Sequence, residues 1–398
     1  MSIGLKVGPP QNTASVIVTS QTEHRIKSGQ LWIYRSDVTE VNANAGDTVK
    51  LIGSRGDILG YGLFSDRSSI AVRLLTHDQY PPDAIWWKEK LVSALRYRKT
   101  LEINATAFRL VHGEGDLLPS LVVDRYGDVL VLQALSQGIE RHTGLIQEIL
   151  IELVRPTAIL AKNDSQVRAL EGLPRSVNLL YGKLPGEIIV FDGVVQMVVD
   201  LLQGEKTGLY LDQRENHIVA AQYAQGRALD CFSYSGGFAL HLANRCDQVL
   251  AVDISKDAVA AISKNASLNR LTNIQPQEAN VFDLLRDLER TQARFDMVIL
   301  DPPAFAKSQA SLSKALAGYK EINLRALKLL SPGGILMTCS CSHYVDEAAF
   351  NELVIASAND ARVQVVLVEK RIQSRDHPVL VSVPATSYLK CLVLRRLH

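Results

Sequence analysis

Residues 227–253, RALDCFSYSGGFALHLANRCDQVLAVD, decide the fold of this chain. They predict a buried strand over 228–232, a turn with Gly236 and Gly237, a helix, and a second strand that ends at Asp253. The run 249–252 is continuously apolar, which is typical of a parallel strand covered on both faces. Such a unit places main-chain N–H groups at a helix start and a carboxylate at the next strand end, which suits a nucleoside-bearing cofactor. A purely structural unit without a ligand is the alternative.

Composition sets the broad class of the protein. A chain of 398 residues with 47% hydrophobic and 21% charged residues is long enough for two or three globular domains. The net charge is +1, so nucleic-acid binding would need a local basic surface. The five cysteines form neither a disulfide framework nor a paired zinc motif. Without a long apolar run or a signal-peptide pattern, a cytoplasmic protein that does not enter a membrane is expected.

Residues 1–77 are expected to form a small β-rich module with glycine-rich turns. A helix is predicted over 22–28 with Thr22 as its cap. Strands are predicted over 16–19, 32–34, 48–52, 58–64 and 70–74. This order, with Gly46-Asp47 before a strand, resembles the PUA domain, an RNA-binding β-barrel. A barrel used for packing or dimer contacts is the alternative.

Residues 78–200 are expected to form a separate α+β module that ends in a β-hairpin. Helices are predicted from Asp83 to residue 100 and over 137–154. Strands are predicted over 108–111, 121–124, 129–134 and 158–161, and hairpin strands over 188–191 and 194–200 around Asp192-Gly193. Acidic residues in this module could form a metal or acid–base cluster, but the surrounding Gly and Pro favour a turn-forming role; they are Glu114, Asp116 and Asp124.

Residues 201–398 continue the alternation of strands and helices. Helices are predicted over 255–269, 281–290, 312–330 and 346–358, and strands over 274–278, 295–301, 335–341, 363–368 and 389–394. The last two strands are joined only by a loop, so they should form an antiparallel edge. The predicted fold class is therefore α/β: a Rossmann-like, mostly parallel sheet with an antiparallel last strand, the layout of a class I S-adenosylmethionine-dependent methyltransferase.

The motif after the first strand separates the candidate cofactors. A dinucleotide needs GxGxxG because its pyrophosphate approaches the backbone, and this chain has SYSGGF instead. S-adenosylmethionine has no pyrophosphate and is favoured. Asp230 would meet its ammonium group or a bridging water, Asp253 its ribose, and Asn280 its adenine. The predicted cofactor-binding residues are Asp230, Phe232, Ser233, Gly236, Gly237, Asp253, Ile254, Asn280, Val281 and Asp301.

Two further stretches are expected to face the substrate. The segment 204–216, GEKTGLYLDQREN, is dense in polar side chains and should cover the ligand, unless it is a capped helix start with solvated charges. The motif DPPAF ends the fourth strand, where prolines stiffen the loop and an aromatic ring offers a flat face for a base, unless the loop merely packs on the sheet. The predicted substrate-binding residues are Lys206, Tyr210, Gln213, Arg214, Pro302, Pro303 and Phe305.

Cys339 and Cys341 end the fifth strand and are expected to face one cleft with Asp301. A thiolate that adds to carbon 6 of a pyrimidine makes carbon 5 nucleophilic enough to accept a methyl group, and a carboxyl group at ring nitrogen 3 would stabilise the adduct. Buried, inert cysteines are the first alternative. A metal site with His343 is the second, but it lacks a fourth ligand, and no metal is expected.

These motifs resemble one family along nearly the whole chain. The stretches KTGLYLDQR, DCFSYSGGFAL, AVDIS, DPPAF, GYKEIN and SCSH, with RLVHGEGDLLPSLVVDRYGD, are similar to the bacterial large-subunit (23S) ribosomal RNA cytosine-C5 methyltransferase I family. The resemblance implies a PUA domain, a central module and a methyltransferase domain. It also implies that Cys341 is the nucleophile and Asp301 the motif carboxylate. The chain departs from the family at Asn280, where aspartate is common, and at His343, where glycine also occurs.

The sequence thus predicts an enzyme that uses S-adenosylmethionine to form 5-methylcytosine in ribosomal RNA, with a homodimer as a further expectation. One alternative is methylation of a guanine or adenine nitrogen, which DPPAF alone would permit. The other is a noncatalytic RNA-binding or ribosome-assembly protein that keeps the fold.

Overall fold

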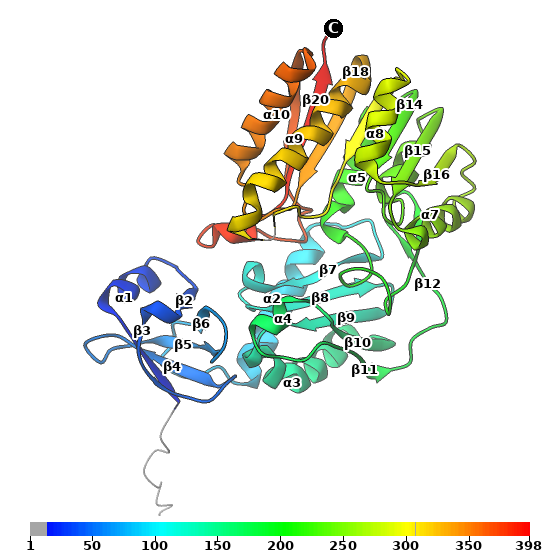
Figure 1. The fold of residues 1–398 in the computed structure, drawn as a ribbon. Helices are drawn as coiled ribbons and strands as arrows, with labels where there is room; N and C mark the ends of the chain where they lie inside the picture. The colour runs from blue at the N-terminus through cyan, green and yellow to red at the C-terminus, as the bar shows by residue number, and fades with distance from the viewer. Residues whose placement is uncertain (1–13, 307) are drawn as a thin grey trace, which may run out of the picture. The chain divides into compact units, whose positions relative to one another are not determined.

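A computed structural model describes residues 14–306 and 308–398, whose helices and strands Figure 1 labels. The chain divides into two compact units. The first consists of Met1–Thr100, Arg109–Leu184 and Pro378–Pro384, and the second of Leu101–Phe108, Pro185–His377 and Ala385–His398. Residues 1–13, which the sequence analysis assigned to the barrel, lie outside the described residues. The domain boundaries after residues 77 and 200 stay predictions.

Six strands of the first unit form the predicted barrel sheet, in the order β2-β6-β5-β4-β1-β3. They are β1 (Ser15–Val18), β2 (Trp32–Tyr34), β3 (Val38–Asn42), β4 (Thr48–Ile52), β5 (Ile58–Phe64) and β6 (Ile70–Thr76). Helix α1 (Ser20–Lys27) follows β1, but its predicted cap is wrong. Thr19 is the cap, because it is still extended after β1 and its Oγ1 accepts from the Thr22 N–H at 3.3 Å.

A five-stranded sheet, in the order β11-β10-β9-β8-β7, forms the rest of the first unit. Its strands are β7 (Ala107–His112), β8 (Leu121–Tyr126), β9 (Val129–Ala134), β10 (Ala158–Asn163) and β11 (Ser176–Gly182), and its helices are α2 (Ala84–Thr100), α3 (Gln137–Val154) and the short α4 (Val167–Leu170). Strands β3 and β11 were not predicted. Both are edge strands with mostly exposed side chains, so neither shows the apolar alternation that marks a half-buried strand.

The acidic residues of the central module have structural partners. Asp116 pairs with buried Arg98, and Asp124, itself fully buried, accepts two hydrogen bonds from Arg109 at 2.8 and 2.9 Å. The Trp32 indole N–H donates to Glu114 at 3.0 Å. These contacts agree with the structural interpretation of the acidic residues over the metal or acid–base cluster.

The second unit contains a hairpin and the large sheet. The hairpin is β12 (Ile188–Phe191) with β13 (Gln196–Val199). The sheet has seven strands in the described part of the chain, in the order β16-β15-β14-β17-β18-β20-β19. These are β14 (Arg227–Cys231), β15 (Gln248–Asp253), β16 (Ile274–Glu278), β17 (Phe295–Leu300), β18 (Leu330–Ser340), β19 (Val365–Arg371) and β20 (Lys390–Arg396).

Helices cover both faces of this sheet. Leu229 and Cys231 of β14 point into a core with α8 (Val281–Arg290), α9 (Leu312–Leu329) and α10 (Glu347–Ala361). Ala228 of the same strand points into the opposite core, with α5 (Arg214–Tyr223), α6 (Gly237–Ala243) and α7 (Lys256–Leu268). Because successive strand residues alternate between faces, the sheet strands must be apolar on both, as the sequence indicated.

At the end of the sheet the strand directions are as predicted, but the start of β18 is not. Strand β20 pairs antiparallel with both β18 and β19, which confirms the predicted antiparallel edge. Strand β18, however, begins at Leu330 and includes 332–334, the predicted turn. The pairing of β17 with β18 shifts register between Phe295 and Met297, and this shift accommodates residues 332–334. The proline and glycines therefore lie within the bent start of β18 and not before it.

Within residues 14–306 and 308–398, none of the helices has the length and apolarity that crossing a bilayer requires.

The ion pair between Arg73 and Glu171 should stabilise the first unit. Both side chains are buried and lie 2.8 Å apart, so Arg73→Met would leave a buried carboxylate uncompensated. We expect a loss of about 3 kcal/mol in the free energy of unfolding. All three tryptophans, Trp32, Trp86 and Trp87, belong to this unit, so tryptophan fluorescence in urea monitors it selectively.

The matched control is Arg67→Met, because Arg67 is largely exposed. Its expected effect lies within about 0.5 kcal/mol. Equal unfolding midpoints for the two variants would contradict a stabilising role for the Arg73–Glu171 pair.

Candidate active site

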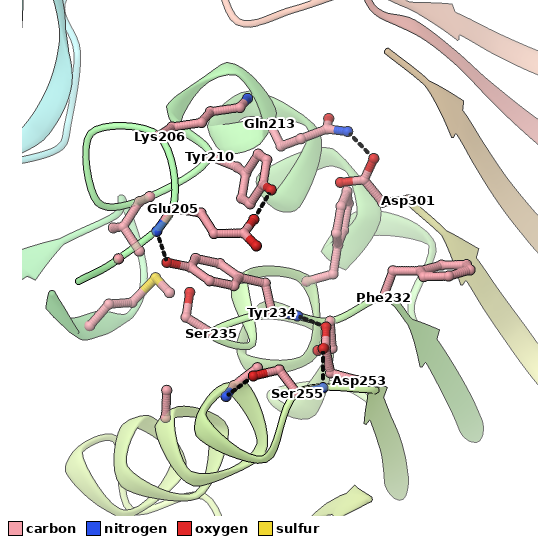
Figure 2. A pocket seen from close by; sticks show the side chains of 18 of the residues that line it. Glu205, Lys206, Tyr210, Gln213, Phe232, Tyr234, Ser235, Asp253, Ser255 and Asp301 are labelled. Atoms are coloured by element: carbon pink, nitrogen blue, oxygen red, sulfur yellow. Dashed lines mark hydrogen bonds between the residues drawn. The ribbon is translucent and has the colours of Figure 1, made fainter. Parts of the chain in front are cut away.

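A cavity of about 930 Å³ lies in the second unit, at the carboxyl ends of β14, β15 and β17, and Figure 2 shows part of its wall. Most of the predicted site residues line it. They are Lys206, Tyr210, Gln213, Arg214, Phe232, Ser233, Gly237, Asp253, Ile254, Asn280, Val281, Asp301, Pro302, Pro303 and Cys341. Asp230, Gly236 and Phe305 are not among the lining residues.

The turn from β14 to α6 has an unusual backbone. Phe232, Tyr234 and Gly236 have φ angles of 64°, 49° and 88°, which only glycine adopts without strain. Asp230 stabilises this turn through two hydrogen bonds: its Oδ2 accepts from Ser233 Oγ at 2.5 Å and from the Ala239 N–H at 3.0 Å. Burial raises the pKa of Asp230 to about 7.

The other oxygen of Asp230 remains available. Its Oδ1 is buried and accepts no hydrogen bond within the described residues. Since buried carboxylate oxygens are normally satisfied, a donor from a ligand or an ordered water fits this position. The expected contact between Asp230 and the cofactor ammonium or a bridging water is compatible with this geometry.

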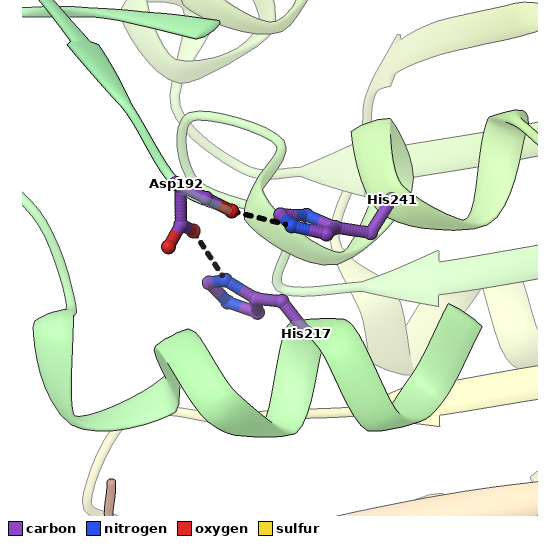
Figure 3. Close-up of side chains that lie close together, drawn as sticks. All are labelled: Asp192, His217 and His241. Carbon is purple, nitrogen blue, oxygen red and sulfur yellow. Dashed lines mark hydrogen bonds and ion pairs between the residues drawn. The ribbon is translucent and has the colours of Figure 1, made fainter. Parts of the chain in front are cut away.

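Gly237 is required by a neighbouring ring. A Cβ atom at this position would lie 2.5 Å from Cε1 of His217, which extends from α5. His217 Nδ1 lies 3.1 Å from Asp192 Oδ2 in the hairpin turn (Figure 3). The glycine thus gives space to a histidine that connects the hairpin to the turn between β14 and α6, a role that the motif alone did not indicate.

His241 completes the Asp192 cluster, which we define as Asp192, His217 and His241. The three side chains offer ligand atoms within 4.8 Å of one another, the spacing of a metal site. Both ring nitrogens of His241, however, face main-chain carbonyl oxygens. Nδ1 lies 2.8 Å from Gly237 O. Nε2 lies 3.1 Å from Asp192 O, the contact that Figure 3 marks. Burial lowers the pKa of His241, so its neutral ring donates from one nitrogen only, and that nitrogen cannot bind a cation; this favours a hydrogen-bonded brace.

The end of β15 presents Asp253 to the cavity. Its Oδ2 accepts from the Tyr234 N–H and its Oδ1 from the Ser255 N–H, both at 2.9 Å (Figure 2). Each oxygen keeps a further lone pair, which suits a ribose diol. Beyond Asp253, Ile254 is exposed, and Asn280 caps α8 by accepting from the Phe282 N–H at 2.9 Å. Together, the carboxylate of Asp253, the apolar side chain of Ile254 and the amide of Asn280 fit a nucleoside.

The segment before α5 forms another side of the cavity. Lys206 Nζ lies 2.7 Å from Asp212 Oδ2 and 4.2 Å from the centre of the Tyr210 ring. The Tyr210 hydroxyl donates to Glu205, which the sequence analysis had not singled out. Burial alone would raise the pKa of Asp212, but the charges of Lys206 and His377 hold it below its usual range.

Arg214, the first residue of α5, is a buried cation in the cavity wall. Its Nη2 lies 3.6 Å from carboxylate oxygens of Glu215 and Asp376, and its Nε has no hydrogen-bond partner within the described residues. A guanidinium group with unused donors can bind an anionic group of a ligand.

The DPPAF loop follows β17. Gln213 Nε2 donates to Asp301 Oδ1 at 2.8 Å (Figure 2). Burial, followed by the charge of Asp212, raises the pKa of Asp301 to about 6. Phe305 packs with its ring centre 4.6 Å from that of Tyr319, in the core beneath the loop. Its contact with a substrate base stays a prediction.

The two cysteines of β18 lie in different places. Cys341 lines the cavity, with its Sγ 4.0 Å from Pro302 O. Cys339 is fully buried opposite Cys391, so the expectation that both cysteines face the cleft is wrong for Cys339. Strand alternation ends at Ser340, and Cys341 is therefore placed by the following loop and not by the pleat.

The charge around Cys341 is mixed. Burial and the carboxylate of Asp301 raise the pKa of the thiol to about 11, while Lys206 and Lys390 act in the opposite direction. Lys390 donates to Ser342 O at 2.8 Å, and sequence reasoning missed it because it lies 49 positions after Cys341. Ser342 also connects this loop to the DPPAF loop, since its Oγ accepts from the Ala306 N–H at 3.2 Å.

Comparisons with protein families agree with this architecture. Residues 16–77 match a model of PUA-like domains, and residues 109–395 match a model of S-adenosylmethionine-dependent methyltransferases. These matches confirm the predicted fold class, a PUA-like barrel before a Rossmann-like methyltransferase fold.

Similar proteins extend along nearly the whole chain. The protein of Aeromonas hydrophila named "Ribosomal RNA large subunit methyltransferase I" is 38% identical over 394 residues, which is 96% of this chain and 99% of the relative. The Shewanella frigidimarina protein of the same name is 37% identical and covers 94% of this chain and 97% of its own length.

Solved structures show the same fold. An S-adenosylmethionine-dependent methyltransferase from Streptococcus mutans has a TM-score of 0.82 at 20% identity and covers 96% of this chain and 99% of its own. A methyltransferase complexed with SAH has a TM-score of 0.83 at 21% identity, with the same coverage. The chain therefore belongs to the S-adenosylmethionine-dependent methyltransferase family, within the group of relatives named ribosomal RNA large subunit methyltransferase I, and its cofactor is S-adenosylmethionine.

Proposed function

We propose that this protein methylates carbon 5 of a cytosine in large-subunit ribosomal RNA. The carrying observation is that a thiol, that of Cys341, and a carboxyl group with a raised pKa, that of Asp301, line the same cavity as the turn between β14 and α6. The printed names of the relatives support the RNA class. Methylation of a purine nitrogen would need no thiol at this position, so Cys341 favours the pyrimidine reaction.

The cofactor would occupy the side of the cavity formed by β14 and β15. We propose that Asp253 binds the ribose, that Asn280, Val281 and Ile254 border the adenine, and that the turn 232–237 with Asp230 holds the methionine part. When bound, S-adenosylmethionine supplies an electrophilic methyl group. No metal ion is required by this proposal.

The first step joins Cys341 to the base. The thiol loses its proton as Asp301 gains one, so the net charge of the pair is unchanged. The sulfur then forms a bond to carbon 6, the electron pair of the carbon 5–carbon 6 bond moves into the ring, and Asp301 donates its proton to nitrogen 3. Proton donation to nitrogen 3 leaves a neutral enamine whose carbon 5 is nucleophilic.

The second step transfers the methyl group and releases the enzyme. Carbon 5 takes the methyl group, water accepts the proton of carbon 5, and its electron pair restores the double bond as the carbon–sulfur bond breaks. Asp301 recovers the proton from nitrogen 3, and Cys341 leaves as a thiolate that Lys206 and Lys390 stabilise. The base must leave its stack to reach this cavity.

Cationic and rigid residues of the wall would hold the RNA. Lys206 and Arg214 can bind phosphate groups, Tyr210 can stack on a base, and Pro302 with Pro303 fixes the loop against the target. The PUA-like barrel would contact surrounding RNA. The cytoplasmic location and the homodimer remain predictions.

A covalent adduct tests the role of Cys341. RNA that contains 5-fluorocytidine cannot lose the substituent at carbon 5, so it should trap the wild-type protein as a species stable in denaturing gels. Cys341→Ser should form no adduct and lose at least about 10³-fold in methylation rate. Cys246→Ser is the matched control, because this buried thiol, which donates to Gln225 O, is not among the residues that line the cavity.

Nucleoside mass spectrometry of the methylated RNA identifies the product. Formation of a methylated purine, or full activity of Cys341→Ser, would disprove the cytosine mechanism. Failure to bind S-adenosylmethionine and to methylate any RNA would favour a noncatalytic RNA-binding protein.

The pair of Cys341 and Asp301 predicts a pH dependence. The active pair shares one proton, whereas below a pKa of about 6 both groups are protonated. The single-turnover rate should therefore fall about tenfold for each pH unit below about 6 and should be level above it up to about 9. Asp301→Asn should lose most of the rate and also the level region above pH 6, because its remaining rate follows ionisation of the Cys341 thiol and rises about tenfold per pH unit up to about 9. A rate that stays level between pH 6 and 9 in this variant would assign the fall below pH 6 to another group.

Gly237→Ala tests the cofactor turn. The added methyl group would lie 2.5 Å from His217 Cε1, so the turn must shift. We expect the Kd for S-adenosylmethionine, measured by calorimetry, to rise at least about tenfold, or about 1.4 kcal/mol. Gly144→Ala in α3 is the control, since open space surrounds Gly144; equal Kd values for the two variants would rule out a tight turn.

A further inference from the structure

The two oxygens of Asp301 have different surroundings. Oδ1 accepts a hydrogen bond from Gln213 Nε2 at 2.8 Å. A side-chain amide presents either its N–H₂ group or its oxygen to a neighbour, with opposite consequences for a carboxyl proton. The orientation of the Gln213 amide therefore decides which oxygen of Asp301 can hold the proton.

Asn216 determines the orientation of Gln213. Both are buried in or just before the first turn of α5, and Asn216 Nδ2 donates to Gln213 Oε1 at 2.6 Å. With its oxygen used in this way, Gln213 must present its N–H₂ group to Asp301. Reversing the Gln213 amide would bring two N–H₂ groups together on one side and two oxygens together on the other.

Two neighbours fix the orientation of the Asn216 amide, one that can only donate a hydrogen bond and one that can only accept it. Arg371 Nε, which can only donate, lies 2.7 Å from Asn216 Oδ1. The Ile372 carbonyl, which can only accept, receives a hydrogen bond from Asn216 Nδ2 at 3.2 Å. Both would be lost if the amide turned over, and each buried orphan would cost about 1–3 kcal/mol.

Arg371 is held in turn at the edge of the sheet. Its Nη1 donates to Glu369 Oε1 at 2.5 Å, and Glu369 Oε2 accepts from the Tyr223 hydroxyl at 3.0 Å. Arg371 and Asn216 are not among the residues that line the cavity, so neither is placed to touch a ligand there. A directed series of donors thus runs from β19 to Asp301.

We propose that Arg371 and Asn216 are positioning residues for catalysis: through Gln213 they keep Asp301 Oδ1 an acceptor, so that the acid proton resides on Oδ2. We call Arg371, Asn216 and Gln213 the positioning relay. This inference rests on the proposed cytosine reaction. There the Oδ2–H bond breaks and the bond between nitrogen 3 and hydrogen forms as Cys341 adds to carbon 6.

Other charged groups around Asp301 act on the pKa of its carboxyl group as a whole. Asp212 disfavours its ionised form, while Lys206 and His217 favour it, and Asp230 and Cys341 are further titratable neighbours. These groups tune how readily the carboxyl group binds a proton. The positioning relay acts on one oxygen, because the hydrogen bond from Gln213 occupies Oδ1 and leaves Oδ2 for the proton.

Asn216→Asp tests the relay with little change of shape. The carboxylate still accepts from Arg371 but cannot donate to Gln213, whose N–H₂ group is then free to turn away from Asp301. The single-turnover rate should fall about 10- to 100-fold, a part of the 10²–10⁴ that a general acid contributes. The acid limb should move to higher pH, since the hydrogen bond from Gln213 lowers the pKa of Asp301. The Kd for S-adenosylmethionine should stay within about twofold of the wild-type value, a change of about 0.4 kcal/mol.

A second pair of variants separates the loss of Asn216 orientation from a loss of folding. Arg371→Lys keeps a group that can only donate, whereas Arg371→Gln can present either polarity to Asn216. Arg371→Lys should retain at least about five times the rate of Arg371→Gln, or about 1 kcal/mol. Lys370→Gln is the control on the same strand, because Lys370 pairs with exposed Glu347, and its rate should equal that of the wild type.

Different results would disprove the proposed function and the positioning relay. If the wild-type protein forms no 5-methylcytidine, the proposed function fails. If it does, and Asn216→Asp keeps the rate and pH profile of Lys370→Gln, the relay is disproved. Should Asn216→Asp not bind the cofactor, equal rates for Arg371→Lys and Arg371→Gln would disprove it instead.

Discussion

One buried carboxyl group, that of Asp230, supports the turn between β14 and α6. It accepts from Ser233 and from the main chain of α6, and it thereby joins a strand, a strained turn and a helix start in one contact. Phe232 and Tyr234 have left-handed backbone angles in this turn, a strained conformation that persists only where surrounding contacts stabilise it. The Asp192 cluster supports the same turn from the hairpin side, through His217 against Gly237.

Charge balance is the second constraint on this cavity. Asp212 and Asp301 lie close together in a poorly hydrated wall, and Lys206 compensates only the first directly. One carboxyl group therefore stays ionised while the other is ready to take a proton near neutral pH, a division of roles seen where environments move two pKa values apart. The thiol of Cys341 is affected by the same charges, so its proton and that of Asp301 are coupled.

Local pattern predicted most of the elements, and its failures have physical reasons. Buried parallel strands such as β14 and β15 are apolar on both faces and are easy to recognise. Edge strands β3 and β11 expose most side chains and have no such pattern. The cap of α1 was misplaced because two threonines three positions apart are equivalent locally, and only the extended backbone at Thr19 distinguishes them.

The sequence by itself predicted the order of the buried strands and of most helices, together with the cofactor class. It also predicted the strand-end residues Asp253 and Asp301, because strand ends of a parallel sheet must meet at one edge. Only the tertiary structure decided that Cys341 and not Cys339 reaches the cavity, since the strand ends between them. Only the tertiary structure brought Arg371 and Asn216 into line with Asp301. Hydrogen bonds between residues 155 positions apart depend on the packing of α5 against the last strands, which no local pattern contains.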